Sequence, residues 1–203
     1  MTILALEFSS DRRSVALARG GVVLAEAAQQ TESRATDALG LIEKVLAEAS
    51  ISREEIDVIA VGLGPGSYTG IRAAIAVAQG WQLARGIKLL GVSSVEALAA
   101  QAQAAKIFGR VNVAVNAQRG EFYLAAWDIS ADRRAEVEPL RIVPAAEVEQ
   151  RRAAAEIVLG ADFPPAAASL AWLAAGRNDF VRGEELSPVY LRETTFVKAP
   201  PVR

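Results

Sequence analysis

The chain has 203 residues, of which 52% are hydrophobic and 23% are charged, and its formal net charge is -2. This length is enough for one large core or for two small lobes that share a seam. The slight acidity argues against a protein that holds nucleic acid through a cationic surface of its own. The sequence contains neither Cys nor His, which excludes thiolate catalysis, Ser-His-Asp triads and zinc sites built on these ligands.

Charge and hydropathy patterning lead to two further expectations. The basic pairs are scattered, each has acids nearby, and we interpret them as solvent-exposed; they are Arg12–Arg13, Arg133–Arg134 and Arg151–Arg152. The N-terminus reaches Glu7 before any sustained apolar run, so it lacks the pattern of a signal peptide. No segment has the apolar length of a membrane span. We therefore expect a soluble cytoplasmic protein with no membrane partner.

The first part of the sequence predicts three antiparallel strands followed by a helix. The strands are expected over residues 2–8, 13–19 and 22–28. Gly20 and Gly21 supply the tight turn between the second and third strands. Leu39, Ile42 and Leu46 recur at helical spacing, which predicts a helix over residues 31–49 with Thr31 as its N-cap.

Beyond this helix, strands and helices alternate, and the order then repeats in a shorter form. The first series comprises a helical turn over 52–55, strands over 57–62 and 87–92, a helix over 71–85, and a helix that begins at Ser93 or Ser94 and runs to 105. The second series comprises strands over 111–117, 121–128 and 137–142, and helices near 144–153 and 164–175. This repeated order predicts two α/β lobes, residues 1–105 and 106–203, with a C-terminal segment able to pack back on the first lobe.

The segment GLGPGSYTGIR, residues 62–72, carries the densest signal, because it places four glycines and a proline between a buried strand and a helix. Two interpretations remain: a structural turn whose glycines allow positive φ and close packing, or a phosphate cradle of backbone N–H groups at a helix N-terminus. Neither the P-loop spacing nor the dinucleotide-binding spacing is present, which favours the turn. The loop residues that we single out are Gly64, Pro65, Gly66, Ser67, Thr69, Gly70 and Arg72.

Two features bear on catalysis. Without a histidine, Ser67 has no conventional activating base, so a catalytic serine is disfavoured. Glu7 ends the first strand and is followed by Ser9 and Ser10. This resembles the place where actin-like kinases and heat-shock ATPases put an acid and small hydroxyl residues around metal and phosphate. A strand-ending acid beside a serine-rich turn accounts for the same residues equally well.

Several segments together resemble one family. They are ILALEFSS, VGLGPGSYTGIRAAIAVAQGWQLARGI, LLGVSSVEALA, NAQRGEFYLAAW and SPVYLRE. Their order and spacing are similar to those of the TsaB (YeaZ) family over nearly the whole chain. The resemblance implies an α/β fold of the actin-like ASKHA (ribonuclease H-like) class, with two lobes that each contain a mixed sheet and helices. It also implies a non-catalytic scaffold, with no cofactor or metal of its own, in the synthase that makes threonylcarbamoyladenosine (t6A) in tRNA.

The same resemblance implies a TsaD-like catalytic subunit and a TsaE-like ATPase as partners, with tRNA contacted only through the complex. It further implies self-association of the isolated chain through the surface that binds TsaD. The chain departs from the family pattern at Glu7, Glu32, Asn116 and Gln118, where the family usually has Asp, His, Asp and Arg. These departures weaken the case for nucleotide hydrolysis by this chain.

The resemblance places the partner surface on the helices over 31–49 and 71–85. The residues carried over are Leu39, Ile42, Ile71, Ile75, Ala78 and Gln82. Such residues also fill the core of a lobe, and we expect a mixture of both roles. On the interface interpretation, Ala78→Glu leaves the monomer folded and abolishes pairing. Two alternatives remain: a free-standing ATP-dependent small-molecule kinase or ATPase, and a peptidase, for which no Ser-Lys dyad or carboxylate pair is visible.

Overall fold

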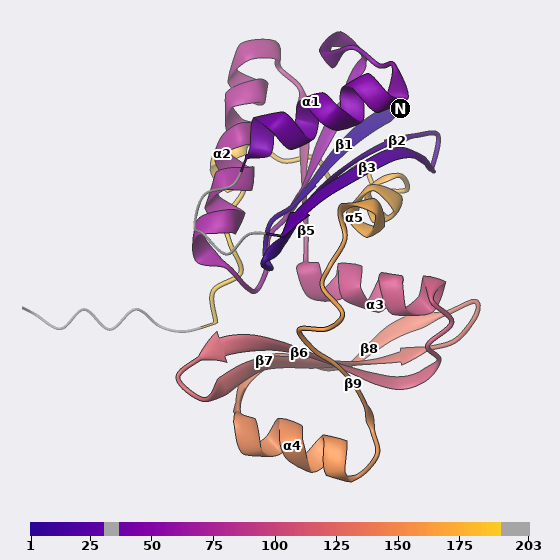
Figure 1. Cartoon of the computed structure of the whole chain (residues 1–203), viewed down its shortest axis with the longest axis vertical. Coiled ribbons are helices and arrows are strands. Elements are labelled where there is room, and N and C mark those ends of the chain that lie inside the picture. Colours follow the sequence, from indigo (N-terminus) through magenta and orange to yellow (C-terminus); the bar gives the residue numbers. More distant parts are fainter. Residues whose placement is uncertain (31–36, 192–203) are drawn as a thin grey trace, which may run out of the picture.

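The computed structural model describes residues 1–30 and 37–191, which form two α/β lobes (Figure 1). The first elements are β1 (Thr2–Glu7), β2 (Arg12–Arg19), β3 (Val22–Gln30), α1 (Ala38–Ala49), the 3-10 turn η1 (Arg53–Glu55), β4 (Val58–Gly62), α2 (Tyr68–Arg85) and β5 (Lys88–Val92). They are followed by α3 (Ser94–Ala104), β6 (Gly109–Gln118), β7 (Glu121–Ile129), β8 (Arg134–Pro144), α4 (Ala145–Ala153), β9 (Ile157–Leu159), α5 (Ala167–Ala174) and the 3-10 turn η2 (Gly183–Glu185).

The five-stranded sheet of the N-terminal lobe has helices on both faces. Its order is β3-β2-β1-β4-β5, in which β1, β2 and β3 are antiparallel and β4 and β5 run parallel to β1. Side chains alternate across a strand, so Leu4 and Leu6 share a core with α1 and α2, whereas Ile3 and Ala5 share a core with α5. All six residues of β1 are buried, which explains their nearly continuous apolar sequence.

The two helices on the outer face of this sheet begin at different residues from those predicted. α1 begins after Asp37, whose side chain accepts a hydrogen bond of 2.9 Å from the backbone N–H three residues further on. The predicted cap, Thr31, lies outside the described residues. α2 begins at Tyr68 instead of residue 71 because Ser67 is its N-cap and accepts a hydrogen bond from the Gly70 N–H. The sequence did not predict this start, because Gly70 lies in the first turn and glycine is a poor helix former.

The C-terminal lobe repeats the topology of the first in a shorter form. Its sheet has the order β8-β7-β6-β9, in which β6, β7 and β8 are antiparallel and β9 is parallel to β6. This arrangement corresponds to β3-β2-β1-β4 in the first sheet. The sequence did not predict β9, because a strand of three residues is too short for a periodic signal. The predicted pair of lobes, each with a mixed sheet and helices, is confirmed.

Helix α3 lies between the two sheets and contributes to both lobes (Figure 1). Ala97 belongs to the core that the first sheet shares with α5. Val95 and Leu98 instead pack with Val113 of β6. Helix α4 covers the opposite face of the second sheet through Val148. The two lobes are therefore joined by a packed helix and not only by a linker.

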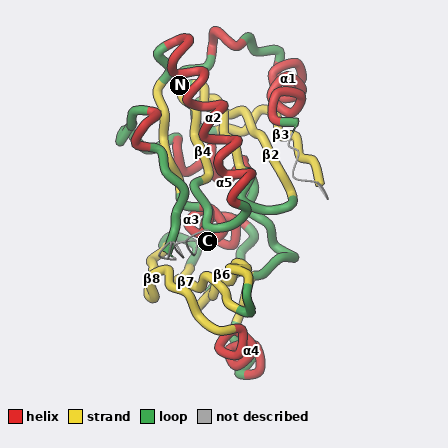
Figure 2. The backbone as a smooth tube through the Cα atoms, turned by 90° about the vertical axis from the view of Figure 1, so that its left-hand side faces the viewer, coloured by secondary structure: helices red, strands yellow, loops and turns green. Residues whose placement is uncertain are grey.

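The chain returns to the first lobe after β9 (Figure 2). At the start of α5, the Ala167 N–H donates a hydrogen bond of 2.9 Å to the Ser14 hydroxyl of β2. Further on, the Val189 N–H donates to the Leu63 carbonyl oxygen over 2.9 Å. Helix α5 and the segment up to Leu191 thus contact the first lobe, although sequence order alone groups them with the second.

Helix α2 is long enough to raise the question of a membrane span. It has 18 residues, and it carries arginines at positions 72 and 85. Within residues 1–30 and 37–191, no helix combines the length and the apolar character that crossing a bilayer needs.

Candidate functional site

The glycine motif packs tightly against the turn between β1 and β2. A Cβ added at Gly66 would lie 2.1 Å from the carbonyl oxygen of Ser9, and one at Gly70 would lie 2.0 Å from that of Phe8. Gly66 also has a φ of +150°, and the Gly64–Pro65 peptide bond is cis. The motif therefore needs glycine for the close approach of two backbone segments.

The backbone N–H groups of the motif donate to acceptors within the protein. The Ser67 N–H donates to the carbonyl oxygen of Ser9 over 2.6 Å, and the Gly64 N–H donates to the Ser94 hydroxyl over 3.1 Å. The Gly70 N–H donates to the Ser67 hydroxyl over 3.4 Å. A phosphate cradle needs N–H groups that face a ligand. These contacts therefore favour the structural turn over the cradle.

The carboxylate of Glu7 is fully buried, and both of its oxygens accept hydrogen bonds. Oε1 accepts from the Ser9 N–H and Oε2 from the Ser94 hydroxyl, each over 2.8 Å. Burial raises the pKa of Glu7 above its usual value of 4.5, although these hydrogen bonds and Arg13 act in the opposite direction. A Cβ at Gly62 would lie 2.2 Å from Oε2. The geometry thus makes Glu7 an internal anchor and does not support a metal-holding role.

The other acidic side chains were considered as possible metal ligands in the same way. Among the residues that the structure describes, no group of three or more Asp and Glu side chains is arranged to hold a metal ion.

Arg13 is 3% exposed, so the prediction that it lies on a solvated face is wrong. Consecutive residues of a strand point to opposite faces, and β2 turns Arg13 into the lobe. Its guanidinium group donates to the carbonyl oxygens of Phe8 and Ser10 and, over 2.9 Å, to the hydroxyl of Ser67. Burial lowers the pKa of Arg13. The side chain joins the β1–β2 turn to the start of α2.

Most of the residues expected at a partner surface lie in the core of the first lobe. Four of them are between 0% and 6% exposed: Ile42, Ile71, Ile75 and Ala78. Gln82 is partly buried and accepts a hydrogen bond of 2.6 Å from the Gly183 N–H. Leu39, by contrast, is 59% exposed. Because Ala78 is fully buried, Ala78→Glu would place a carboxylate in the core, contrary to the expectation of a folded monomer.

Another set of α2 residues faces outward. This outer stripe consists of Arg72, Ala76, Gly80 and Leu83, which recur at intervals of four, four and three and are all exposed. Leu83 is 91% exposed. A Cβ added at Gly80 would meet no atom within 4 Å. We take this stripe, together with the exposed Leu39 of α1, which covers the same face of the sheet (Figure 1), as a candidate surface.

The motif also contacts the C-terminal segment through an aromatic pair. The rings of Tyr68 and Tyr190 lie 5.6 Å apart. The Arg72 guanidinium group lies 5.1 Å from the centre of the Tyr68 ring and donates to its hydroxyl over 2.8 Å. Burial is the main cause of a raised pKa at Tyr190. The exposed Thr69 follows Tyr68 in the first turn of α2. The sequence alone does not predict the aromatic pair, because its members are distant in the chain.

An open cleft of about 1260 Å³ lies between the two lobes. The N-terminal lobe contributes residues 9–12 and the motif residues 66–68. The C-terminal lobe contributes residues 114–119 and residues 160, 161 and 163–165, and Tyr190 also lines the cleft. No local pattern could have predicted it, since its walls come from segments that are far apart in sequence.

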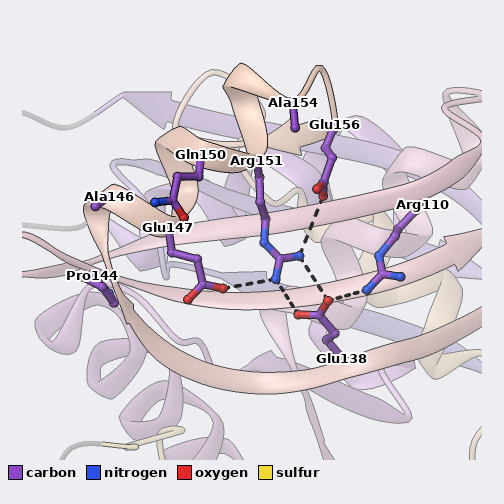
Figure 3. A pocket seen from close by; sticks show the side chains of 9 residues that line it. All are labelled: Arg110, Glu138, Pro144, Ala146, Glu147, Gln150, Arg151, Ala154 and Glu156. Carbon is purple, nitrogen blue, oxygen red and sulfur yellow. Dashed lines mark hydrogen bonds and ion pairs between the residues drawn. The ribbon is translucent and has the colours of Figure 1, made fainter.

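A second cavity, of about 870 Å³, lies beside α4 on the outer side of the second sheet (Figure 3). Arg151 lies at its centre and donates to Glu138 over 2.7 Å and to Glu147 over 3.1 Å. The hydrogen bond from Arg151 is the main cause that lowers the pKa of Glu138 to about 2, and Arg110 acts in the same direction. The Arg151 side chain is only 14% exposed, which corrects the prediction of a solvated face. Because these charges pair with one another, we interpret the cavity as a structural ion network.

Comparison with known proteins identifies the family. A family model described as "TsaD: tRNA N6-adenosine threonylcarbamoyltransferase" matches residues 2–181. The chain belongs to this family. The matched range includes both sheets, the glycine motif and the cleft residues as far as position 165.

The curated relatives and a solved structure show which members of this family the chain is similar to. The chain is 33% identical over 127 residues to the tRNA threonylcarbamoyladenosine biosynthesis protein TsaB of Escherichia coli (strain K12), which covers 63% of this chain and 55% of the relative. TsaB of Bacillus subtilis (strain 168) is 31% identical over 124 residues, which covers 61% and 53%. The match thus spans about half the length of these curated relatives. YeaZ from Pseudomonas aeruginosa has a TM-score of 0.80 at 28% identity, which covers 93% of this chain and 100% of that one. The resemblance to TsaB (YeaZ) and the predicted α/β fold are confirmed.

Proposed function

We propose that the chain is a non-catalytic scaffold and activator subunit of the synthase that makes t6A in tRNA. In this proposal it pairs with a TsaD-like catalytic subunit, and a TsaE-like ATPase joins the pair. Family membership and the names of the TsaB relatives support the assignment to t6A biosynthesis. The observation that carries the scaffold role is the outer stripe of α2, in which Ala76, Gly80 and Leu83 are exposed apolar or small residues.

Gly80 is the most informative residue of this stripe. A glycine inside an exposed helix costs about 1 kcal/mol relative to alanine, because it loses more conformational freedom on folding. No atom of the described residues lies within 4 Å of where its Cβ would be, so packing within the chain does not require glycine. A partner helix that approaches closely at this point would explain it.

Leu39 and Leu83 supply the apolar contacts of the proposed surface. The two side chains are 59% and 91% exposed, and a leucine buried at a protein interface stabilises the complex by about 1.5–3 kcal/mol. The inner sides of these helices pack in the core of the lobe through Ile42, Ile71, Ile75 and Ala78. Gln82 of α2 is partly buried. We expect the same surface to allow self-association when the catalytic subunit is absent.

The internal contacts of the motif support a scaffold over an ATP-using enzyme. The N–H groups of Gly64, Ser67 and Gly70 donate to protein acceptors. Both oxygens of Glu7 are likewise occupied. A free-standing kinase or ATPase would need these groups to face phosphate and a cation.

Reconstitution with the TsaD-like subunit of the same organism tests the proposal. We expect the wild-type chain to co-elute with that subunit on size exclusion and to increase the yield of t6A in the complete synthase. Leu83→Glu should abolish both effects, because it places a charge in the proposed apolar contact. Ala146→Glu, on exposed α4 in the other lobe, is the matched control and should behave as wild type.

The two parts of the proposal fail separately. If the wild-type chain does not change the yield of t6A, the scaffold role is wrong. If Leu83→Glu still pairs and still activates the catalytic subunit, the role stands but the surface is wrong.

A further inference from the structure

Within the described residues, the chain passes between the two lobes at two places. The first connection is α3, which leads from β5 to β6, and the second is the segment 160–166, which leads from β9 back to α5 (Figure 1). Lobes joined in this way move relative to each other only if the connecting segments change their backbone angles. Whether the cleft closes therefore depends on what holds α3 and the segment 160–166.

Gln101 of α3 holds the second connection through both ends of its side-chain amide. Its Nε2 donates a hydrogen bond of 3.1 Å to the carbonyl oxygen of Pro164, and its Oε1 accepts one of 3.1 Å from the Ala166 N–H. A side-chain amide has both donors and an acceptor, so one glutamine satisfies both backbone groups. The next N–H, that of Ala167, donates to the hydroxyl of the buried Ser14 in β2. The two connections are therefore tied to each other and to the first sheet.

A second set of contacts bridges the lobes near the C-terminal end of α3. Arg134, the first residue of β8, donates a hydrogen bond of 2.9 Å to Oε1 of Gln103. The amide nitrogen of Gln103 donates over 2.8 Å to the carbonyl oxygen of Ser130, in the turn before β8. The Arg134 guanidinium group also lies 5.7 Å from the centre of the Trp172 ring in α5, a cation–π contact. Because β8 belongs to the second sheet and α5 packs on the first, this contact joins the lobes directly.

The apolar contacts of α3 indicate the same fixed arrangement. Ala97 is fully buried in the core that the first sheet shares with α5. Ala99 and Ala102 are also fully buried, and they pack with Val111 of β6 in the second sheet. Phe163 of the second connection packs against the same cluster. Because protein interiors are close-packed, a rotation of one lobe would break contacts on one side of α3.

We propose that Gln101, Gln103, Arg134 and Trp172 form an interlobe clamp, which holds the two lobes in one orientation and keeps the cleft open. The clamp accounts for Trp172, which is 54% exposed and contacts the second lobe through Arg134. A partner that touches both lobes would meet one rigid surface, and its binding would not have to order the lobes. The clamp is a property of the chain by itself and does not depend on pairing with a catalytic subunit.

Distance measurements by electron paramagnetic resonance on the full chain test the clamp. The chain has no cysteine, so Glu48→Cys and Glu149→Cys introduce the only two sites for spin labels. Both positions are exposed, the first on α1 in one lobe and the second on α4 in the other. We expect one narrow distribution of distances between the two labels. A broad distribution, or two separate distances, would overturn the inference.

Gln101→Leu combined with Trp172→Ala opens the clamp in the labelled chain. The double variant loses both hydrogen bonds to the segment 160–166 and the ring beside Arg134, so we expect the distribution to broaden or to shift. Gln79→Leu is the matched control, because it removes a hydrogen bond of 2.8 Å from a glutamine to a backbone carbonyl oxygen between α2 and η2, outside the clamp. It should leave the distribution narrow.

Circular dichroism shows whether the clamp variants are folded. If the double variant does not fold, Trp172→Ala alone provides the test, because its exposed position tolerates the change. An unchanged distribution in the clamp variant that folds, or equal broadening in Gln79→Leu, would mean that these contacts do not set the orientation of the lobes.

Discussion

Arg13 donates a hydrogen bond of 2.9 Å to the hydroxyl of Ser67, although the two residues are 54 positions apart in sequence. Ser67 is the N-cap of α2, and the same guanidinium group contacts the carbonyl oxygens of Phe8 and Ser10. One side chain therefore connects the β1–β2 turn, the glycine motif and the first turn of α2. These segments together form the N-terminal wall of the cleft.

Arg13→Met should destabilise the protein by about 2 kcal/mol, because it leaves carbonyl oxygens without a donor in a buried environment. Urea denaturation monitored by circular dichroism measures the effect. The control is Arg12→Met, whose side chain is 35% exposed and lies 4.0 Å from Glu26; the expected change there is below about 0.5 kcal/mol. Equal effects of the two substitutions would contradict the structural role of Arg13.

Two glycines of the same helix should respond in opposite directions to alanine. Gly70→Ala places a Cβ 2.0 Å from the Phe8 carbonyl oxygen, so the backbone must move, and we expect a loss of about 3 kcal/mol or no soluble protein. Gly80→Ala meets no atom within 4 Å and should stabilise the chain by about 0.5–1 kcal/mol. Thermal unfolding of both variants provides the comparison. A stable Gly70→Ala variant would rule out the close backbone packing described here.

Glu7 should make stability fall as the pH rises. Because burial raises the pKa of Glu7 in the folded chain above 4.5, the folded state binds its proton more readily than the unfolded state. The free energy of unfolding therefore decreases from about pH 4.5 up to the folded-state pKa and is then constant. Glu7→Gln removes this contribution, so its stability relative to wild type should increase over that interval.

Urea titrations at a series of pH values test this dependence on Glu7. Glu48→Gln, on the exposed side of α1, should follow the wild-type profile. If Glu7→Gln and wild type differ by the same amount at every pH, the carboxyl group does not change its protonation with folding as we describe.

Glu138 should have the opposite pH dependence. Its pKa is lowered to about 2, first by the hydrogen bond from Arg151 (Figure 3). Its contribution is therefore present above pH 4.5 and is lost as the pH falls toward 2. The group is partly exposed to solvent, which screens its ion pairs, so we expect a loss of only about 1 kcal/mol in Glu138→Gln at neutral pH, and a smaller loss in 1 M salt.

Calorimetric unfolding between pH 2 and 7 would detect the contribution of Glu138. Glu149→Gln is a suitable control, because Glu149 pairs with Arg152 at a more exposed position, where its side chain is 63% exposed. A salt-independent loss in Glu138→Gln would show that packing, and not charge, is the cause.

The repeated order of strands and helices, the apolar runs that become β1 and β4, and the glycine motif could all be predicted from sequence. These features depend on residues that are neighbours in the chain, so the pattern of apolar, polar and glycine residues predicts them directly. The absence of His and Cys also limits the possible chemistry through composition alone. The segments that carry the family resemblance are of the same local kind.

Only the tertiary structure shows which side chains are buried and which are exposed at the surface. The helical spacing of Ile42, Ile71 and Ala78 indicated an apolar face, but only the packing of α1 and α2 on the sheet shows that this face is buried and that Leu39 and Leu83 lie outside it. The burial of Arg13, the Tyr68–Tyr190 pair and the return of α5 to the first lobe depend on segments that are distant in sequence. Such contacts leave no local pattern, because each chain segment meets its partner only after the whole chain has folded.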